Sequence, residues 1–127
     1  MDSQISFSEC LARYILEKGK YVISKGRVKH SVFMPPSGLK LSVYRIAGLN
    51  ENEVWEIGRI YVADKQSKSL LGRADIIALS VYEQKLKVES DPSPHPLHAN
   101  IVDWPPDKEA QKEIALELAD AAQLHLI

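Results

Sequence analysis

Residues 39–46 carry the clearest alternation of apolar and polar positions in the chain. Leu39, Leu41 and Val43 occupy every second position, and basic, polar or aromatic side chains lie between them. A period of two is typical of a strand that buries one face. This segment is therefore predicted to be a β-strand.

The preceding residues 27–34 predict a second strand. Val28 and Val32 are β-branched, and β-branched side chains favour extended structure. Residues 35–38 contain two prolines and a glycine, which is typical of a turn. We therefore expect residues 25–45 to include a β-hairpin with its two strands side by side.

Residues 6–18 show helical spacing rather than alternation. Ser6, followed three residues later by Glu9, matches a capping box. Leu11 and Tyr14 then continue an apolar stripe at helical spacing, and a glycine follows the segment. An N-terminal helix is predicted here.

Two further helices are predicted. Asn50 with Glu53 repeats the start signal and predicts a short middle helix over residues 51–57, closed by a glycine. Residues 106–123 predict a C-terminal helix, because apolar side chains recur on one face and acidic residues lie in the first turn.

The remaining apolar segments favour strands, and one of them is ambiguous. Strands are predicted over residues 59–64, 86–90 and 98–104. Residues 74–85 allow two interpretations, a buried strand over 74–78 followed by a short helix, or one continuous helix. We favour the strand because a glycine precedes it and another strand-like segment follows.

This order of elements indicates the α+β class. The expected architecture is a small, mainly antiparallel sheet with an N-terminal helix, a short middle helix and a C-terminal helix. The chain has 127 residues, of which 45% are hydrophobic and 26% charged, as in an average globular protein. We therefore expect residues 1–127 to form a single domain.

The composition limits the compartment and the partners that we expect for this protein. A formal net charge of −1 does not indicate a nucleic acid or a membrane as partner. The single cysteine, Cys10, allows no intramolecular disulfide, and we interpret it as a small core residue rather than a nucleophile. No signal-peptide pattern occurs, and no apolar run approaches the roughly 18–20 residues of a membrane span. We expect a cytoplasmic protein with no membrane partner and no cofactor.

The charges are nevertheless unevenly distributed. Residues 18–50 contain seven bases and no acid, whereas residues 83–127 contain nine acids and four bases. If the predicted hairpin presents one basic face with an aromatic side chain, that face suits phosphate contacts and base stacking. The candidate binding residues are Lys25, Arg27, Lys29, Lys40, Tyr44 and Arg45. Packing of this face against the acidic third of the same chain is an alternative.

Residues 91–107 contain five of the seven prolines and form the second candidate site. Asp91, His95 and His98 are residue types that bind metals or transfer protons, and a stiff loop could position them. The spacing of these residues matches no strong zinc motif. The alternative is that the segment has only a structural role, as a connector between packed elements. No known catalytic or nucleotide-binding motif occurs elsewhere.

Three functions are therefore considered. The first is a small non-enzymatic binding module that acts as a subunit or regulator in a larger protein assembly, with an unidentified protein partner. The second is a nucleic-acid-binding domain that uses the basic hairpin. The third is a metal-dependent hydrolase centred on Asp91, His95 and His98.

Overall fold

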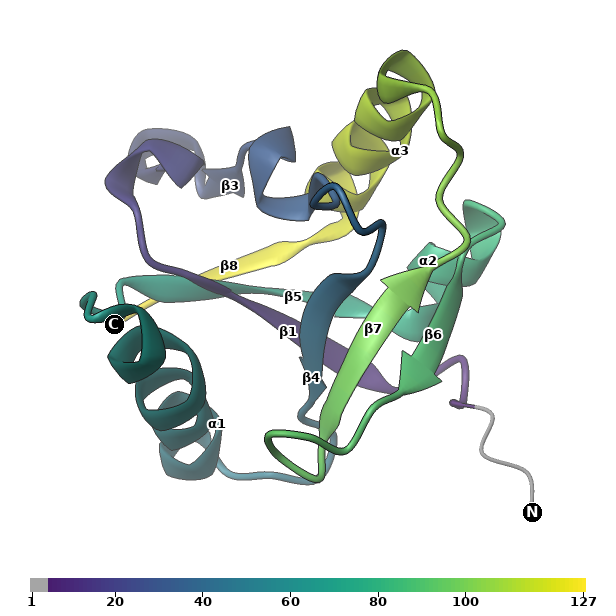
Figure 1. Cartoon of the computed structure of the whole chain (residues 1–127). Helices are drawn as coiled ribbons and strands as arrows, with labels where there is room; N and C mark the ends of the chain where they lie inside the picture. The colour runs from purple at the N-terminus through teal and green to yellow at the C-terminus, as the bar shows by residue number, and fades with distance from the viewer. Residues whose placement is uncertain (1–4) are drawn as a thin grey trace.

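The computed structural model describes residues 5–127 and confirms the α+β class (Figure 1). Its centre is a six-stranded sheet in which every neighbouring pair is antiparallel. The strand order across the sheet is β6 (Lys87–Ser90), β7 (His98–Val102), β4 (Leu41–Arg45), β1 (Cys10–Ile15), β5 (Gly72–Ile77) and β8 (Gln123–Leu126). Two short strands, β2 (Tyr21–Val22) and β3 (Arg27–Val28), pair with each other apart from this sheet.

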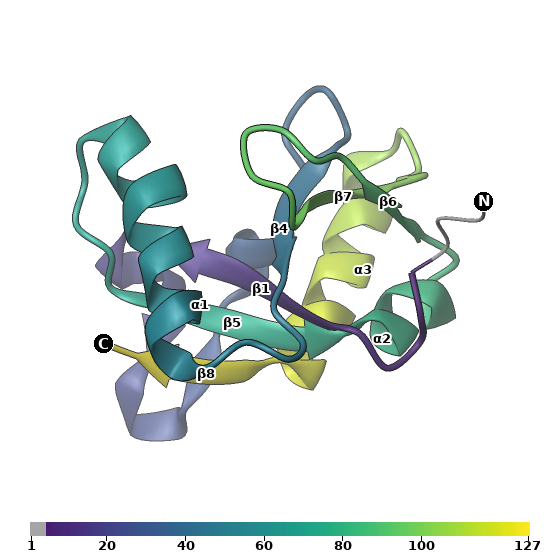
Figure 2. The same ribbon diagram turned by 90° about the horizontal axis from the view of Figure 1, so that it is seen from below.

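Helices cover both faces of the sheet. The α-helices are α1 (Glu51–Ile57), α2 (Ala78–Glu83) and α3 (Lys108–Ala121), and α1 continues as the π-helical η4 (Gly58–Ala63) and the 3-10 turn η5 (Asp64–Gln66). Three more 3-10 turns are η1 (Lys18–Lys20), η2 (Ile23–Lys25) and η3 (His30–Phe33). Figures 1 and 2 show α1 and α3 on opposite sides of the central strands. No helix in the described part of the chain has the length and apolar character that crossing a bilayer requires.

Alternating side chains of the central strands build one core on each face. On β1, Leu11 and Ile15 join the cluster under α3 and η3, whereas Ala12 and Tyr14 join the cluster under α1 and η4. This is the period of two that a strand imposes on its side chains.

The predicted N-terminal helix is wrong, because residues 10–15 form the central strand β1. Apart from Arg13, both faces of β1 are apolar, which hides the alternation. The helical spacing of Leu11 and Tyr14 is accidental, since the two side chains enter opposite cores. Ser6 and Glu9, which were predicted to form a capping box, instead form a turn. In this turn the Glu9 amide donates to the Ser6 carbonyl at 3.1 Å.

The predicted pairing of residues 27–34 with residues 39–46 is also wrong. The strand β4 forms where the alternation predicts it, but its neighbours are β1 and β7. Residues 30–33 turn into η3, because Val32 and Phe33 are needed in the core under α3. Only β3 remains of the first strand, and it pairs with β2.

The middle helix begins as predicted and then runs further. Both hydrogen bonds of the capping box form between Asn50 and Glu53, at 2.9 and 3.0 Å. Gly58 does not end the helix but adopts helical dihedral angles, so residues 59–64, predicted as a strand, are helical. A glycine is needed at this position because a Cβ would lie 2.5 Å from the ring of Tyr14.

The last third of the chain follows the predictions closely. Residues 74–85 are a strand followed by a short helix, and the predicted strands at 86–90 and 98–104 correspond to β6 and β7. The predicted C-terminal helix corresponds to α3, and Trp104 is buried just before it, with its indole N–H donating to the Ile101 carbonyl at 3.0 Å. The final strand β8 was not predicted.

Candidate functional site

A gap opens between two central strands of the sheet. Strands β1 and β4 pair only at Leu11–Arg45 and Ala12–Tyr44, whereas β1 and β5 pair over six residues. Figure 1 shows β1 and β4 crossing and then running apart. The backbone carbonyl of Ser42, beyond the last pair, therefore lacks an amide donor from β1.

Arg13 fills this gap with its side chain. Its Nη1 donates to the Ser42 carbonyl and its Nε donates to the Val32 carbonyl, both at 3.1 Å. The guanidinium thus replaces the missing ladder hydrogen bond and ties η3 to β4. The same side chain lines two adjoining hollows of about 190 and 220 Å³.

The larger of these hollows, here called the strand-gap pocket, is the candidate site. It lies between the end of β1, the first half of β4, the η4–η5 segment and the start of β7. Its walls carry cationic, hydroxyl, imidazole and aromatic side chains but no carboxylate among the described residues. The lining residues are Arg13, Tyr14, Ser42, Tyr44, Tyr61, Val62, Lys65, Gln66, Pro94 and His98.

The charge of Arg13 has no anionic partner within residues 5–127. Its hydrogen bonds go to two neutral carbonyl groups, and it forms none of the ion pairs found in that range. Burial alone lowers the pKa of Arg13 from its ordinary value. An arginine still stays protonated in a protein, so the pocket contains a partly buried positive charge.

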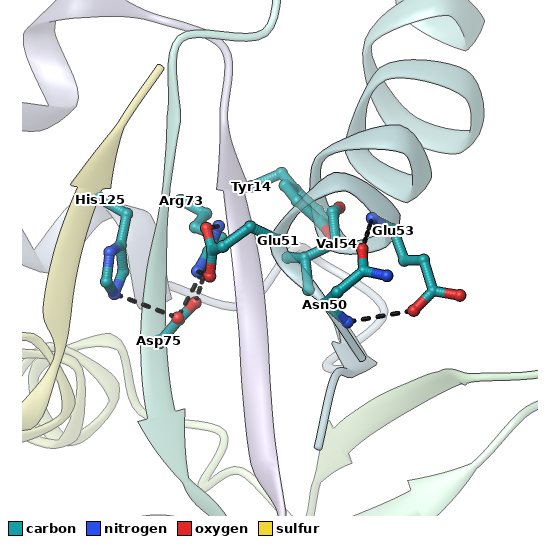
Figure 3. A network of polar contacts seen from close by, with 8 residues as sticks. All are labelled: Tyr14, Asn50, Glu51, Glu53, Val54, Arg73, Asp75 and His125. Carbon is teal, nitrogen blue, oxygen red and sulfur yellow. Dashed lines mark hydrogen bonds and ion pairs between the residues drawn. The ribbon is translucent and has the colours of Figure 1, made fainter. Parts of the chain in front are cut away.

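A fully buried arginine, Arg73 on β5, shows how this chain neutralises such a charge elsewhere. Figure 3 shows Glu51 of α1 and Asp75 of β5 converging on it. Both Glu51 oxygens accept hydrogen bonds from Arg73, at 3.0 and 3.1 Å, and Asp75 accepts from Nε at 3.0 Å. His125 lies 3.3 Å from the other Asp75 oxygen, and these contacts tie α1, β5 and β8 together. Arg13 has no equivalent arrangement among the described residues.

A chain of polar contacts leads from the pocket into the 91–98 loop. The Ser42 hydroxyl is hydrogen-bonded to Nε2 of His98, and Nδ1 of His98 lies 2.9 Å from the main-chain oxygen of Asp91. The Asp91 carboxylate is 3.6 Å from the same nitrogen and accepts a hydrogen bond from Asn100 at 3.1 Å. Residues 42, 91 and 98 are thus joined across β4, β7 and the loop.

Of the three loop residues predicted from the sequence, two lie in contact with each other beside the pocket and the third packs against aromatic rings. Asp91 and His98 are in contact, and His98 is buried and faces the pocket. His95 instead packs its ring against Tyr61 and Tyr44, with ring centres 4.8 and 6.2 Å apart, and its Nδ1 accepts from the Leu97 amide at 3.0 Å. Within residues 5–127, no group of three or more His, Cys, Asp or Glu side chains is placed to hold a metal ion.

Aromatic rings form another part of the pocket wall. Tyr44 is buried and packs against Tyr14 and His98, with ring centres 5.7 and 5.2 Å apart. Burial raises the pKa of Tyr44, so its hydroxyl stays neutral and can donate a hydrogen bond. The pocket can therefore receive an organic group as well as a charge.

No match to this chain was found among models of protein families, curated proteins or solved structures. The geometry and chemistry of the pocket are therefore the basis for assigning a function.

The predicted basic surface does not form as one face. Lys25, Arg27 and Lys29 lie near β3 and line a separate hollow beside α3. Arg27 forms a 2.6 Å ion pair with Asp120 of α3. This contact corresponds to the alternative in which the basic residues pack against the acidic third of the same chain. Lys40 is exposed in the turn before β4.

The other two predicted binding residues, Tyr44 and Arg45, are consecutive on β4 and have different environments. Tyr44 is buried in the strand-gap pocket because the α1–η4 segment covers that face of β4. Arg45 is bonded to Glu9 at 3.2 Å. The six predicted residues are thus distributed over four places.

Sequence reasoning missed Arg13, Ser42 and Tyr61 as site residues. One signal was present, since Arg13 interrupts the otherwise apolar run at residues 10–16. A charged residue inside a central strand needs a special environment. The helical interpretation of this segment left that signal unused.

Proposed function

We propose that this chain is a binding module that holds a small organic anion in the strand-gap pocket. The observation that carries the proposal is the partly buried guanidinium of Arg13, which no carboxylate neutralises within the described residues. Withdrawing a charge from water costs free energy, and an anion compensates a cation more strongly than neutral carbonyl oxygens do. A carboxylate or phosphate group in the pocket would supply the missing partner.

The size and lining of the pocket limit the ligand. A volume of about 220 Å³ equals that of about seven water molecules at roughly 30 Å³ each. This space suits a metabolite-sized group rather than a folded partner. Lys65 adds a second positive charge to the wall, and Tyr44 and Tyr61 offer ring surface to the body of the ligand.

The test is calorimetric titration with succinate and with its neutral isostere succinamide. We expect succinate to bind and succinamide not to bind. Arg13→Gln should weaken succinate binding about 10–100-fold, the equivalent of losing charge-assisted hydrogen bonds of about 1.5–3 kcal/mol. The matched control is Arg59→Gln, which removes the same charge from a residue that lines a different hollow.

Two results would contradict the proposal. One is equal affinity of the native protein for succinate and succinamide. The other is an equal effect of Arg13→Gln and Arg59→Gln, provided that circular dichroism shows both variants folded. The Arg13→Lys variant keeps the charge and should bind succinate more tightly than Arg13→Gln does. It provides a second measurement if Arg13→Gln does not fold.

A role within a larger protein assembly remains a second candidate, and one surface favours it. Phe7 is 59% exposed and packs edge-on against Tyr82, with ring centres 5.4 Å apart. Leu79 is also exposed, and its amide donates to the Phe7 carbonyl, so the three side chains form a small apolar patch. Phe7→Ser should weaken self-association or partner binding in sedimentation experiments, and unchanged sedimentation would remove this candidate.

Nucleic-acid binding is a third candidate, now supported only by Lys25, Arg27 and Lys29 beside α3. If these residues contact phosphates, affinity should fall steeply with salt. Reversal of Arg27 to Glu should abolish the binding. Affinity for a short DNA that is unchanged by this reversal would eliminate the candidate.

A further inference from the structure

We propose that the strand-gap pocket also cleaves its ligand, with Ser42 as the nucleophile for a small anionic ester, His98 as its general base and Asp91 as a residue that positions His98. This inference rests on the proposed function, because Arg13 would hold the anionic end of the ester. It adds a chemical step that anion binding alone does not require.

The hydrogen bonds of His98 determine its tautomer. The main-chain oxygen of Asp91, 2.9 Å from Nδ1, can only accept, so Nδ1 carries the hydrogen. In the neutral ring Nε2 is then unprotonated, and it accepts from the Ser42 hydroxyl. This is the tautomer that a general base needs in order to remove the serine proton.

The surroundings of Asp91 hold that arrangement in place. Its main-chain amide donates to the His98 carbonyl at 2.9 Å, and its carboxylate lies 3.6 Å from Nδ1 of His98. Asn100 on β7 donates to the carboxylate at 3.1 Å. The negative charge is therefore close enough to stabilise the imidazolium that forms when His98 takes a proton.

The proposed nucleophile and base, Ser42 and His98, are 56 residues apart in the chain and meet at one cavity, and Asp91 lies behind His98. Ser42 lies on β4, His98 begins β7, and both side chains line the strand-gap pocket. The imidazole is buried, whereas Ser42 is partly accessible. Arg13 donates to the main-chain oxygen of Ser42 itself, so its positive charge lies next to the nucleophile.

The proposed reaction is ester hydrolysis through an acyl-serine. Ser42 Oγ attacks the ester carbonyl carbon while Nε2 of His98 takes the hydroxyl proton. The tetrahedral intermediate collapses, the bond to the alkoxide oxygen breaks, and His98 gives its proton to the departing alcohol. Water then attacks the acyl-serine, His98 takes the water proton and returns it to Ser42 Oγ, and the carboxylic acid is released.

Arg13 determines which esters are cleaved. An acyl group with a remote carboxylate can place that charge on the guanidinium while its ester carbonyl lies at Ser42. The matched neutral ester lacks this contact. The preference for the anionic ester should therefore depend on Arg13, and the chemical step should depend on Ser42 and His98.

The test compares 4-nitrophenyl hemisuccinate with 4-nitrophenyl butyrate as substrates of the full chain, together with labelling by a fluorophosphonate probe. We expect hydrolysis of the hemisuccinate above the buffer rate and one covalent label on Ser42 by peptide mass spectrometry. Ser42→Ala should abolish both, and His98→Gln should slow hydrolysis about 100-fold or more, as for loss of a general base. Ser90→Ala, a serine on the edge strand β6, is the control and should change neither.

Further variants separate the roles. Arg13→Gln should remove the preference for the hemisuccinate while leaving the fluorophosphonate label on Ser42. Asp91→Ala should lower kcat with little change in KM, because it acts on His98 and not on the ester. A change in KM alone would show that Asp91 does not position the base.

The outcomes distinguish this inference from the proposed function. Succinate binding without any label or hydrolysis overturns the catalytic proposal and leaves anion binding intact. Labelling of Ser42 without succinate binding overturns the role of Arg13. Hydrolysis that is equal in the native protein and Ser42→Ala overturns the assignment of the nucleophile. Circular dichroism of each variant establishes that it is folded.

Discussion

At the residue scale, a buried arginine and a partly buried arginine on neighbouring strands are compensated in two different ways. A guanidinium in the interior needs compensation for its lost hydration. Arg73 obtains it from Glu51 and Asp75, and its guanidinium also lies 4.6 Å from the centre of the Trp55 ring. Arg13 receives only carbonyl oxygens in the described chain. The first arginine therefore stabilises the fold, and the second is available to a ligand.

The structural role of Arg73 predicts a large loss of stability on its removal. Arg73→Met would leave Asp75 buried with only His125 beside it. We expect the free energy of unfolding in urea to fall by about 3–5 kcal/mol, as for other broken buried ion pairs. Arg27→Met, which removes the exposed pair with Asp120, should cost less than about 1 kcal/mol. Similar losses for both variants would contradict this role.

Cys10 predicts a slow reaction with thiol reagents. It lies in β1, and burial, with a smaller contribution from Asp75, raises the pKa of its thiol to about 11. At pH 8 the thiolate fraction is then about a hundred times lower than for a thiol with the ordinary pKa of 9.0. Alkylation by iodoacetamide should be slower by about this factor in the native protein than in urea. Equal rates would show that the thiol is accessible and unperturbed.

Single residues were only partly predictable from the sequence. Asp91 and His98 could be named because their chemistry is distinctive and a proline-rich loop holds them near each other. Ser42 could not, because a serine at a polar position of a strand carries no local signal. Its partner His98 is 56 residues away, and only the pairing of β4 with β7 brings the two together.

At the element scale, burial on both faces of the sheet explains which segments were misinterpreted. β4 shows its alternation because one face carries polar or aromatic side chains, so its strand was predicted correctly. Apart from Arg13, β1 is apolar on both faces, so its period is hidden. The helix start at Asn50 and Glu53 was predictable because capping is a local interaction.

Because the helix continues through Gly58, replacing this glycine by alanine should destabilise the protein, which is the opposite of the usual effect inside a helix. In an open helix, Gly→Ala stabilises by up to about 1 kcal/mol. At position 58 the new Cβ would lie 2.5 Å from the Tyr14 ring and 3.1 Å from Leu70, so overpacking should outweigh the gain in helix propensity. We expect Gly58→Ala to lower the free energy of unfolding by about 1–3 kcal/mol.

The control is Gly38→Ala in the turn before β4, where a Cβ meets nothing within 4 Å. This variant should be neutral within about 0.5 kcal/mol. Urea unfolding of both variants measures the difference. A stabilised Gly58→Ala would contradict the close contact between the helix and β1.

At the scale of the whole molecule, the sheet joins residues that the chain keeps far apart. The six strands follow the order β6-β7-β4-β1-β5-β8, which requires pairing between segments distant in sequence. Local patterns indicate that strands exist but not which strands are neighbours. This is why the α+β class was predictable, whereas the gap between β1 and β4 was not.

The uneven charge distribution is likewise resolved at this scale. The bases of residues 18–50 are spread over several separate parts of the surface, and Arg27 among them pairs with Asp120 of the acidic third. The functionally informative charge is therefore not the largest basic cluster. It is Arg13, a single cation just outside that segment.

The central claim, that Arg13 binds an anion in the strand-gap pocket, is tested most directly by nuclear magnetic resonance of arginine side chains. The Nε–H signal of Arg13 can be assigned by its absence in Arg13→Gln and followed during titration with succinate. We predict a saturable shift of the Arg13 signal and no shift of the Arg59 signal. An Arg13 signal that does not move, or that moves linearly together with Arg59, would contradict the claim.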